Sequence, residues 1–362
     1  AAMNVPLLHG AVASEYRLRR AATTLSALSA RGARSVVISH IGEQGTETLE
    51  PVAHALKAFV PRLSFCPAPS GPTARDAVRS LLPGETVVLE NLRRNRGEVG
   101  NDPSFAKELG SLGDCFVQDA FDTCHRAHAS MVGVPKILPS YAGLVLESEI
   151  AELSRALQPK HPSIAIIGGA KFSTKESVLS LLLKKYDTVF VGGALANDFL
   201  RAQGHSIGAS LSSPASSQDM GRIRTFLSHA TLVLPIDVVV AHNPLRRETQ
   251  RVTSVTNIHP DEYVTDIGPA TAALVASLIE KSQTVLWNGP LGRYEDGFVE
   301  GTDHIAETIA RCPVRSLVGG GDTLVTLESL GLLSHFSFVS TGGGAMLDFL
   351  AGETLPGIAA LN

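Results

Sequence analysis

At residues 316–327 the chain reads SLVGGGDTLVTL: an apolar run, three consecutive glycines and then a stretch with helical spacing. A second triplet, at 342–344, follows the run FVST and precedes AML. Consecutive glycines cost backbone entropy on folding, so a chain needs a local reason to keep them. At a strand-to-helix junction, bare N–H groups and the positive end of the helix dipole can face an anion, most often a phosphate. A tight turn is the alternative reading, but two triplets favour a phosphate site.

Glycine pairs repeat this pattern earlier in the second half. GGAK at 168–171 and GG at 192–193 each follow an apolar run. Neither familiar nucleotide fingerprint is present, because no G-x-x-x-x-G-K-[ST] and no helix-opening G-x-G-x-x-G occurs. A P-loop and a dinucleotide-dependent dehydrogenase are therefore disfavoured. Ligands of open parallel sheets bind at the carboxyl ends of the strands, so we expect the four junctions to line one crevice.

The fold class follows from short apolar runs that alternate with helical stretches. The runs lie at 35–38, 86–89, 115–117, 164–167, 188–191, 231–234, 284–287 and 336–339, and helical stretches include 16–31, 174–183 and 269–281. Continuously apolar strands are typical of parallel sheets that are covered on both faces. We therefore predict an α/β fold with two doubly wound parallel-sheet domains.

The length of 362 residues is enough for two domains. A helix at 141–158, ended by the prolines at 159 and 162, is the expected hinge between them. We place the first domain at 1–140, the second at 159–345 and a C-terminal tail at 346–362. The chain opens on AAMNVP, which reads as the end of a strand already under way, so we also expect that it is a module of a longer protein.

The composition of the chain argues against two classes of binding partner, nucleic acid and membrane. The net charge is −4, which argues against a surface that coats nucleic acid. No apolar run has the length of a membrane span, and no targeting segment is visible. The four cysteines form no C-x-x-C pair, which is typical of a reduced protein without structural zinc. We expect an intracellular, cytoplasmic protein that binds neither nucleic acid nor a membrane.

Two lysines and an aspartate in the second half suit a nucleotide phosphate and its cation. Lys171 and Lys175 are four residues apart, so a helix that begins here would place both on one side. Solvated surface lysines are the alternative. Asp322 follows the first glycine triplet, where it can cap the helix, hold a divalent cation, or do both.

Basic side chains collect at the strand ends of the first half. His40 and Arg93 follow apolar runs, Arg126 lies in the segment HRAH at 125–128, and Arg17 opens a helix. Arginine suits bidentate contacts with phosphate or carboxylate, so these residues indicate an anion site. Each one alone could be structural or solvated. His125 and His128 have no third metal ligand at a convincing spacing.

Ten motifs in order make the chain resemble the phosphoglycerate kinase family over essentially its whole length. They are NVPL (4–7), SHIG (39–42), LENLR (89–93), DAF with HRAHAS (119–130), GGAK (168–171), LPIDVVVA (234–241), DIGP (266–269), WNGPLG (287–292), GGGDT (319–323) and STGGG (340–344). The tail LPGIAAL (355–361) also matches, and in the family it returns to the first domain.

The resemblance implies reversible phosphoryl transfer between 1,3-bisphosphoglycerate and ADP, giving 3-phosphoglycerate and ATP. The first domain would bind the phosphoglycerate and the second the nucleotide with Mg²⁺. Closure of the hinge would bring the substrates together. We expect the catalytic unit to be a monomer, fused to another domain if the chain is a module.

The same resemblance assigns residues. Those implied for catalysis are Arg17, Lys171, Gly320 and Gly343. Those implied for phosphoglycerate binding are Asn4, Arg17, His40, Arg93 and Arg126. Those implied for nucleotide binding are Lys171, Lys175, Gly192, Gly193, Asn288, Pro290, Gly292, Glu295, Gly319, Gly320, Gly321, Asp322 and Thr323. Asp322 would hold the Mg²⁺, and Glu295 would meet the ribose hydroxyls.

Three positions depart from the family pattern, all on the phosphoglycerate side. Ala2 stands where the family has aspartate, Glu43 where it has arginine and Asp122 where it has glycine. The substrate is anionic, so added carboxylates should weaken its binding at neutral pH, where they are charged. The alternative reading is a nucleotide-binding regulatory module of a larger protein that has lost most catalysis.

Overall fold

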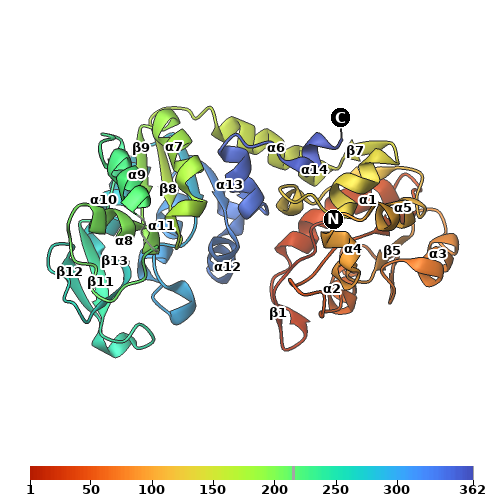
Figure 1. Ribbon diagram of the computed structural model, residues 1–362, viewed down its shortest axis with the longest axis horizontal. Helices are drawn as coiled ribbons and strands as arrows, with labels where there is room; N and C mark the ends of the chain where they lie inside the picture. The colour runs from red at the N-terminus through yellow and green to blue at the C-terminus, as the bar shows by residue number, and fades with distance from the viewer. Residues whose placement is uncertain (214–216, 362) are drawn as a thin grey trace. The chain divides into compact units, whose positions relative to one another are not determined.

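The structure is a computed structural model that describes residues 1–213 and 217–361 (Figure 1). It divides into two compact units. Unit 1 comprises Ala1–Ala151 together with Glu353 and the residues after it, and unit 2 comprises Glu152–Gly352. The division falls inside helix α6 (Leu144–Ala156), within the segment where the sequence placed a hinge helix. Asn362, the last residue of the tail, lies outside the described residues.

Unit 1 contains three small sheets. A hairpin pairs β1 (Leu7–Leu8) with β2 (Ala11–Val12), a parallel sheet has the order β3-β5-β4, and β6 pairs in parallel with β7. Their strands are β3 (Ser35–Val37), β4 (Leu63–Cys66), β5 (Thr86–Leu89), β6 (Phe116–Gln118) and β7 (Ser140–Ala142). The α-helices are α1 (Tyr16–Ser29), α2 (Glu50–Leu56), α3 (Gly71–Arg79), α4 (Arg96–Val99), α5 (Pro103–Gly110), the first part of α6 and α14 (Pro356–Ala359).

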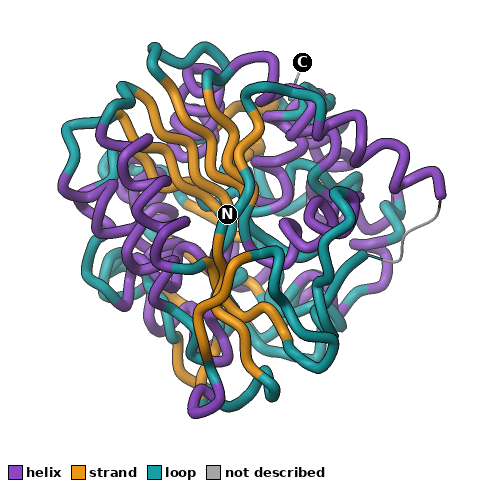
Figure 2. The backbone as a smooth tube through the Cα atoms, turned by 90° about the vertical axis from the view of Figure 1, so that its left-hand side faces the viewer, coloured by secondary structure: helices purple, strands orange, loops and turns teal. Residues whose placement is uncertain are grey.

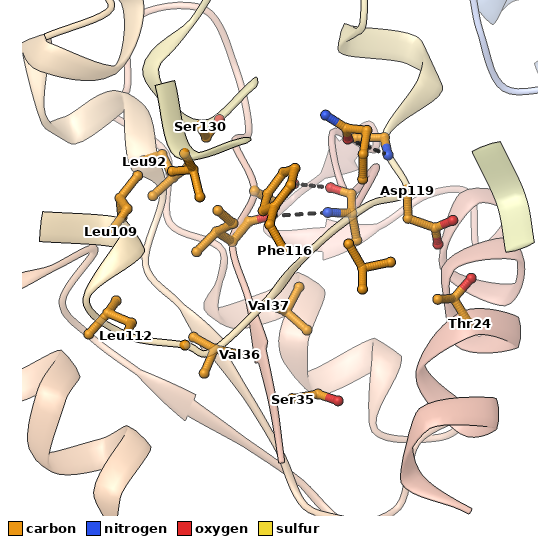
Figure 3. A pocket seen from close by; sticks show the side chains of 18 of the residues that line it. Thr24, Ser35, Val36, Val37, Leu92, Leu109, Leu112, Phe116, Asp119 and Ser130 are labelled. Carbon is orange, nitrogen blue, oxygen red and sulfur yellow. Dashed lines mark hydrogen bonds between the residues drawn. The ribbon is translucent and has the colours of Figure 1, made fainter. Parts of the chain in front are cut away.

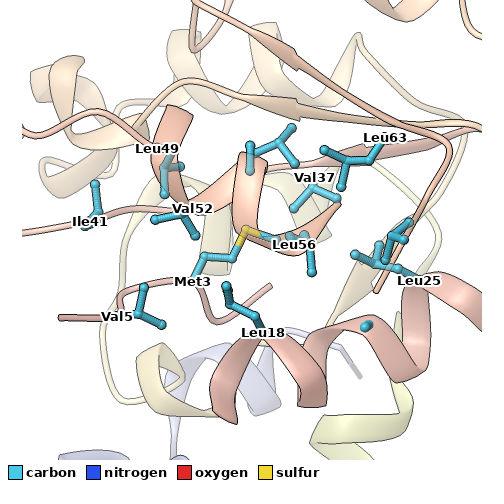
Figure 4. Packing of buried hydrophobic residues seen from close by; sticks show 14 residues of the cluster. Met3, Val5, Leu18, Leu25, Val37, Ile41, Leu49, Val52, Leu56 and Leu63 are labelled. Atoms are coloured by element: carbon cyan, nitrogen blue, oxygen red, sulfur yellow. The ribbon is translucent and has the colours of Figure 1, made fainter. Parts of the chain in front are cut away.

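One core of unit 1 forms where α1 and α2 cover the β3-β5-β4 sheet. Leu18 and Leu25 of α1 are seven residues apart, so both project from one helix face onto Val37 and Leu56 (Figure 4). Met3 joins the same cluster and is fully buried. Burial of each such side chain contributes about 1.5–3 kcal/mol. The core therefore fixes the segment around Met3, which leads into Asn4.

Unit 2 is built on a six-stranded sheet with the order β10-β9-β8-β14-β15-β16, all in parallel (Figure 2). Its strands are β8 (Ser163–Ile167), β9 (Thr188–Val191), β10 (Leu232–Val233), β14 (Thr284–Asn288), β15 (Arg315–Gly319) and β16 (Phe338–Ser340). The α-helices of the unit are the rest of α6, α7 (Glu176–Lys185), α8 (Gly193–Ala202), α9 (Ser217–Leu227), α10 (Pro269–Glu280), α11 (Glu300–Arg311), α12 (Gly321–Ser329) and α13 (Gly344–Leu350). The α/β class and the parallel sheet are confirmed.

A second sheet in unit 2 departs from the all-parallel prediction. Strand β11 (Asp237–Ala241) pairs antiparallel with both β12 (Arg251–Ser254) and β13 (Tyr263–Ile267). The run DVVVA has the same apolar composition as the parallel strands, so its sequence does not reveal the direction of its partners. A parallel crossover needs a dozen or more residues. The connections after β11 and β12 are shorter, so they permit antiparallel pairing.

No helix of the described residues combines the length and the apolar character that crossing a membrane requires.

Candidate active site

The glycine junctions of unit 2 lie at one edge of the six-stranded sheet. Strands β9, β8, β14, β15 and β16 are consecutive neighbours, and all run in the same direction. Their carboxyl ends therefore meet at a common edge, where the segments at 168–171, 192–193, 289–292, 319–323 and 342–344 begin or pass. This is the arrangement that the sequence predicted for a crevice.

A cavity of about 180 Å³ opens at this edge. Five residues expected to bind nucleotide line it: Gly193, Pro290, Gly292, Glu295 and Asp322. Its other lining residues are Gly169, Ala170, Ala194, Asn197, Leu211, Tyr263, Val264, Thr265, Asp266, Leu291 and Arg293. The mixture of apolar walls and a few polar groups is typical of a small-molecule site.

A buried polar network joins three of the loops beside this cavity. The Lys175 Nζ donates to Asn288 Oδ1 at 2.5 Å, and the next residue, Gly289, donates its N–H to Thr323 Oγ1 at 3.0 Å. All the side chains in these bonds are buried. The network ties the loops after β8, β14 and β15 together, so the backbone groups of these loops are held in place.

Lys171 and Lys175 do not share a helix face, which corrects the expectation from their spacing. A 3-10 turn, η5 (Phe172–Thr174), separates them, and α7 begins only after Lys175. Lys175 is buried, whereas Lys171 is exposed. The two ammonium groups therefore differ in environment, and burial lowers the pKa of Lys175 to about 8.

If Lys175 contacts the nucleotide phosphates, as the family resemblance implies, its pKa predicts a loss of nucleotide affinity in alkaline solution. The lysine is charged below its pKa, so most molecules carry the ammonium at pH 7 and few carry it at pH 9. We expect kcat/KM for ADP, which reports the free enzyme, to fall above about pH 8. The pH dependence of initial rates should lack this inflection in Lys175→Arg, since guanidinium stays charged. The same inflection in both proteins would refute the assignment.

The glycines at this edge differ in their backbone conformation and in the space that the protein leaves for a side chain. Gly320 and Gly343 have φ of 112° and 52°, in the left-handed region that other residues rarely adopt. A Cβ on Gly168 would overlap the backbone oxygens of Pro290 and Gly289. Gly321, in contrast, has no heavy atom within 4 Å of an added Cβ. The protein itself therefore leaves room at Gly321 and none at Gly168.

This contrast separates a structural glycine from one that a ligand requires. We expect Gly168→Ala to lower the free energy of unfolding by about 1–3 kcal/mol through overpacking. Gly321→Ala should leave stability nearly unchanged. If the nucleotide phosphates lie against Gly321, as the family resemblance implies, the added methyl group should raise the KM for ADP about tenfold or more. Urea unfolding and steady-state kinetics on both variants test this, and an unchanged KM in Gly321→Ala would exclude close approach of the nucleotide there.

In unit 1, Arg17 lies at the start of α1 beside the N-terminal segment. Its guanidinium donates to the backbone oxygen of Asn4, and its Nη1 lies 3.8 Å from Asp122 Oδ2. Asn4 Oδ1 in turn accepts a hydrogen bond from Gly42 N at 3.1 Å. The structure therefore places Arg17, Asn4 and the loop after β3 together, and it makes Asp122 a partner of Arg17.

A second group of basic residues surrounds His40. Burial lowers the pKa of His40 to about 3, and the charges of Arg93 and Arg126 act in the same direction. Burial and the same two arginines lower the pKa of His128 to about 4. Both imidazoles are therefore neutral near pH 7, and the positive charge of the cluster comes from the arginines. Such a cluster attracts a polyanion.

The loop that carries Arg93 is fixed by a buried asparagine. Asn91 Oδ1 accepts from Arg93 N at 3.1 Å, and its Nδ2 donates to the oxygens of Ile41 at 2.7 Å and Glu47 at 2.9 Å. Arg93 Nη1 donates to Gly42 O at 2.5 Å. These bonds join the motifs SHIG and LENLR, because side chains of LENLR hold the backbone of the loop that carries SHIG.

The comparisons with known proteins agree with this geometry. The family model described as phosphoglycerate kinase matches residues 1–353. The phosphoglycerate kinase of Roseiflexus sp. (strain RS-1) is 42% identical over 372 residues, which cover 99% of this chain and 94% of the relative. That of Moorella thermoacetica is 41% identical over 374 residues, with the same coverage.

The chain belongs to the phosphoglycerate kinase family. Solved structures give the same result. Phosphoglycerate kinase from Coxiella burnetii matches with a TM-score of 0.81 and 37% identity, covering 99% of this chain and 94% of the other. The enzyme from Pyrococcus horikoshii matches with a TM-score of 0.88 and 29% identity, covering 100% and 94%.

Sequence reasoning missed several residues that lie at the two candidate sites. Asn197 lines the cavity one helical turn after Gly193, so the i,i+4 spacing in α8 could have indicated it. Tyr263 and Arg293 also line it, and Arg293 N donates to Thr265 O at 2.8 Å. Recognition of the antiparallel sheet would have placed Tyr263 there, and Arg293 directly follows the motif WNGPLG. His128 was noted but not assigned to the anion site.

Proposed function

We propose that this chain catalyses reversible phosphoryl transfer between 1,3-bisphosphoglycerate and ADP, giving 3-phosphoglycerate and ATP. The observation that carries the proposal is that this member of the family has a group of candidate binding residues in each unit. Unit 1 has the basic cluster with Arg17, and unit 2 has the glycine edge with its lysines and Asp322. Nothing in the relatives supports the alternative of a regulatory nucleotide-binding module.

We assign phosphoglycerate binding to the basic groups of unit 1. Arg93 and Arg126 would neutralise the carboxylate and phosphate, while neutral His40 would donate or accept a hydrogen bond. Asn4 would orient the substrate, since its side chain is already held by Gly42. The buried position of Arg93 supports this role, because a partly desolvated guanidinium interacts more strongly with an anion than an exposed one.

We assign nucleotide binding to the edge of the unit 2 sheet. The cavity lined by Gly193, Pro290 and Gly292 would hold the base, and Glu295, exposed at its rim, would meet the ribose. Gly192 is the N-cap of α8 and directly precedes Gly193, which lines the cavity. Lys175, Asn288, Thr323 and the N–H groups of Gly319, Gly320 and Gly321 would hold the phosphates, aided by the N-terminus of α12.

Asp322 fits the magnesium ion that the family implies. No cluster of three or more potential metal ligands occurs among the described residues. Mg²⁺ does not need one, since it is usually held by one or two carboxylates, water and the nucleotide's own phosphates. Asp322 is exposed in the first turn of α12 and lines the nucleotide cavity. The ion would neutralise phosphate charge.

Catalysis would rest on positioning and on neutralising charge. Phosphoryl transfer passes through a loose transition state whose charge spreads over the phosphoryl oxygens. Arg17, Lys171 and the N–H groups around Gly320 and Gly343 are the groups we propose to stabilise that charge. Lys171 is suited to this role because it is exposed at the sheet edge, unlike Lys175.

We further propose that Glu43 and Asp122 weaken binding of the anionic substrate at neutral pH. The Asp122 carboxylate lies 3.8 Å from the Arg17 guanidinium, so its negative charge offsets part of the positive potential that an anionic substrate would meet. Removal of one such charge is worth about 1 kcal/mol. Asp122→Gly should therefore lower the KM for 3-phosphoglycerate about fivefold, and Glu43→Arg, which changes the charge by two units, should lower it about thirtyfold. The KM for ATP is the internal control, and an equal change in both constants would contradict the proposal.

An assay in both directions tests the function. Product ATP is measured from ADP and 1,3-bisphosphoglycerate, and consumption of ATP is measured with 3-phosphoglycerate. Turnover in both directions that requires Mg²⁺ is the expected result. Nucleotide binding without turnover would instead support the regulatory alternative.

The proposed site of action is the cytoplasm. The four cysteines are free thiols in the structure, as in reducing compartments. The monomeric state and the fusion to a further domain stay predictions.

A further inference from the structure

The motif DAF (119–121) begins with an aspartate to which the proposed function gives no role. Asp119 directly follows β6 and is buried, and in Figure 3 it lies beside Thr24 of α1. Its Oδ1 accepts hydrogen bonds from Val145 N at 2.9 Å and from Leu146 N at 3.3 Å. Burial raises the pKa of Asp119, and these two hydrogen bonds act against that rise. The buried carboxylate therefore finds its partners in the backbone of α6.

These two hydrogen bonds are the ones that an N-cap side chain normally makes. Val145 and Leu146 are the second and third residues of α6, and their N–H groups have no acceptor within the helix. Gly143 occupies the capping position, because its carbonyl oxygen accepts the first helical bond, from Glu147 N at 2.9 Å. Since glycine has no side chain that could cap the helix, Asp119 caps α6 from another segment of the chain.

Gly143 also provides the space that this remote cap needs. A Cβ on Gly143 would overlap the Asp119 carboxylate, and the φ of Gly143 lies outside the left-handed region, so space and not backbone conformation requires the glycine. Gly143 N donates to Gln118 O at 2.8 Å, which holds the glycine against the end of β6. A side chain at residue 143 and the Asp119 carboxylate therefore exclude each other.

The segment after Asp119 is wound into consecutive turns that end among the basic residues of unit 1. Three backbone hydrogen bonds form these turns: Thr123 N to Ala120 O at 3.1 Å, Cys124 N to Phe121 O at 3.0 Å and Arg126 N to Thr123 O at 2.9 Å. The segment carries Arg126 and also Asp122, which lies 3.8 Å from Arg17. Because the turns are continuous, the position of Asp119 helps to set the position of Arg126.

We propose that Asp119 is a positioning residue for phosphoglycerate binding: by capping α6 from outside the helix, its carboxylate ties the segment 120–126 to the helix in which the two units divide. The inference rests on the proposed assignment of phosphoglycerate binding to unit 1. A capping side chain at residue 143 itself would hold only the helix. Asp119 holds the helix and the segment with the same two hydrogen bonds.

The test compares Asp119→Ala with the double variant Asp119→Ala/Gly143→Ser. Asp119→Ala should lower Tm by about 3 °C or more, because two N–H groups of α6 lose their acceptor. It should also raise the Kd for 3-phosphoglycerate, measured by calorimetry, about tenfold, with the Kd for ADP unchanged. In the double variant the new serine can cap α6 locally, so Tm and the slow hydrogen exchange of the Val145 and Leu146 amides should return.

The double variant separates the two roles of Asp119. Its Kd for 3-phosphoglycerate should stay raised, and the amides of Cys124 and Arg126 should still exchange faster than in the unmodified chain, since the segment is no longer tied to α6. If phosphoglycerate binding recovers together with Tm, Asp119 is a helix cap only and the proposal is wrong. Asp119→Asn keeps an acceptor oxygen and should retain most of the phosphoglycerate affinity.

Gly143→Ala is an independent check from the side of the helix. Its Cβ would displace the Asp119 carboxylate, so it should weaken phosphoglycerate binding about as much as Asp119→Ala and add nothing to that variant, where the space is free. Gly113→Ala is the matched control, because its Cβ would make only an ordinary contact, 3.6 Å from Cys115 O. Unchanged phosphoglycerate binding in Gly143→Ala would contradict the proposal. If the unmodified chain fails to bind 3-phosphoglycerate, the proposed function is wrong, and the exchange rates at residues 124 and 126 still decide whether Asp119 holds the segment.

Discussion

Replacing Arg17 with alanine should lower kcat about 10³-fold in both directions of the reaction, with a smaller change in the KM for ADP. The reason is that Arg17 presents a guanidinium held in place by Asn4 O and Asp122. An arginine that stabilises a transferring phosphoryl group acts mainly in the transition state, so its loss appears in kcat. Arg17→Lys keeps the charge but loses the planar fork, and should recover only part of the rate. Steady-state kinetics with both substrates gives the measurement.

Arg19→Ala is the matched control for this prediction. Arg19 lies on the same helix, with a side chain 64% exposed and an ion pair to Glu15 at 2.9 Å. Its loss should leave kcat unchanged. Urea unfolding of both variants separates catalysis from stability, because Arg17→Ala also leaves Asp122 without this cation. If the two variants lose activity equally, or if Asp122→Gly restores the rate of Arg17→Ala, the direct catalytic role is wrong.

Local signals in the sequence predicted the glycine edge well. At this edge an apolar run is followed by glycines, a pattern that favours the end of a strand. It occurs after the strand at 284–288 and at the triplets 319–321 and 342–344. Because parallel strands must end at a common edge, the junctions were expected to lie together. The observed strands differ from the predicted runs by one or two residues at their ends.

The environments of individual side chains could not be predicted in the same way. Whether Lys175 is buried depends on a 3-10 turn of three residues, which its spacing from Lys171 does not reveal. Asp122 pairs with Arg17, and because the two residues are far apart in the chain, the sequence does not reveal this contact. Asp122 is therefore a partner of Arg17 in addition to a charge that repels the substrate. The same limit applies to the antiparallel sheet, where β11 reads like a parallel strand.

Asp322→Ala should abolish most of the Mg²⁺-dependent activity, with a loss in kcat/KM for ADP of about 10²–10³-fold. Asp322 is exposed at the N-terminus of α12 and lines the nucleotide cavity, so its removal costs no packing. Its carboxylate also favours the helix N-terminus by about 0.3–1 kcal/mol, so stability should fall only slightly. Initial rates over a range of total Mg²⁺ should show that the variant needs a higher concentration for half-maximal activity.

Glu328→Ala on the same helix separates the metal from the helix. Glu328 lies in the last turn of α12, where a carboxylate faces the negative end of the dipole, so its loss should be neutral or stabilising and leave the Mg²⁺ requirement unchanged. Asp322→Asn keeps the size but loses the charge; the N-cap of α12 is Gly320 and not Asp322, which makes no capping hydrogen bond and lies in the first turn. If it behaves like Asp322→Ala in its Mg²⁺ dependence, the carboxylate acts on the cation. If it retains full activity at low Mg²⁺, Asp322 contributes only its charge to the helix N-terminus, and the cation is held by the phosphates and other groups.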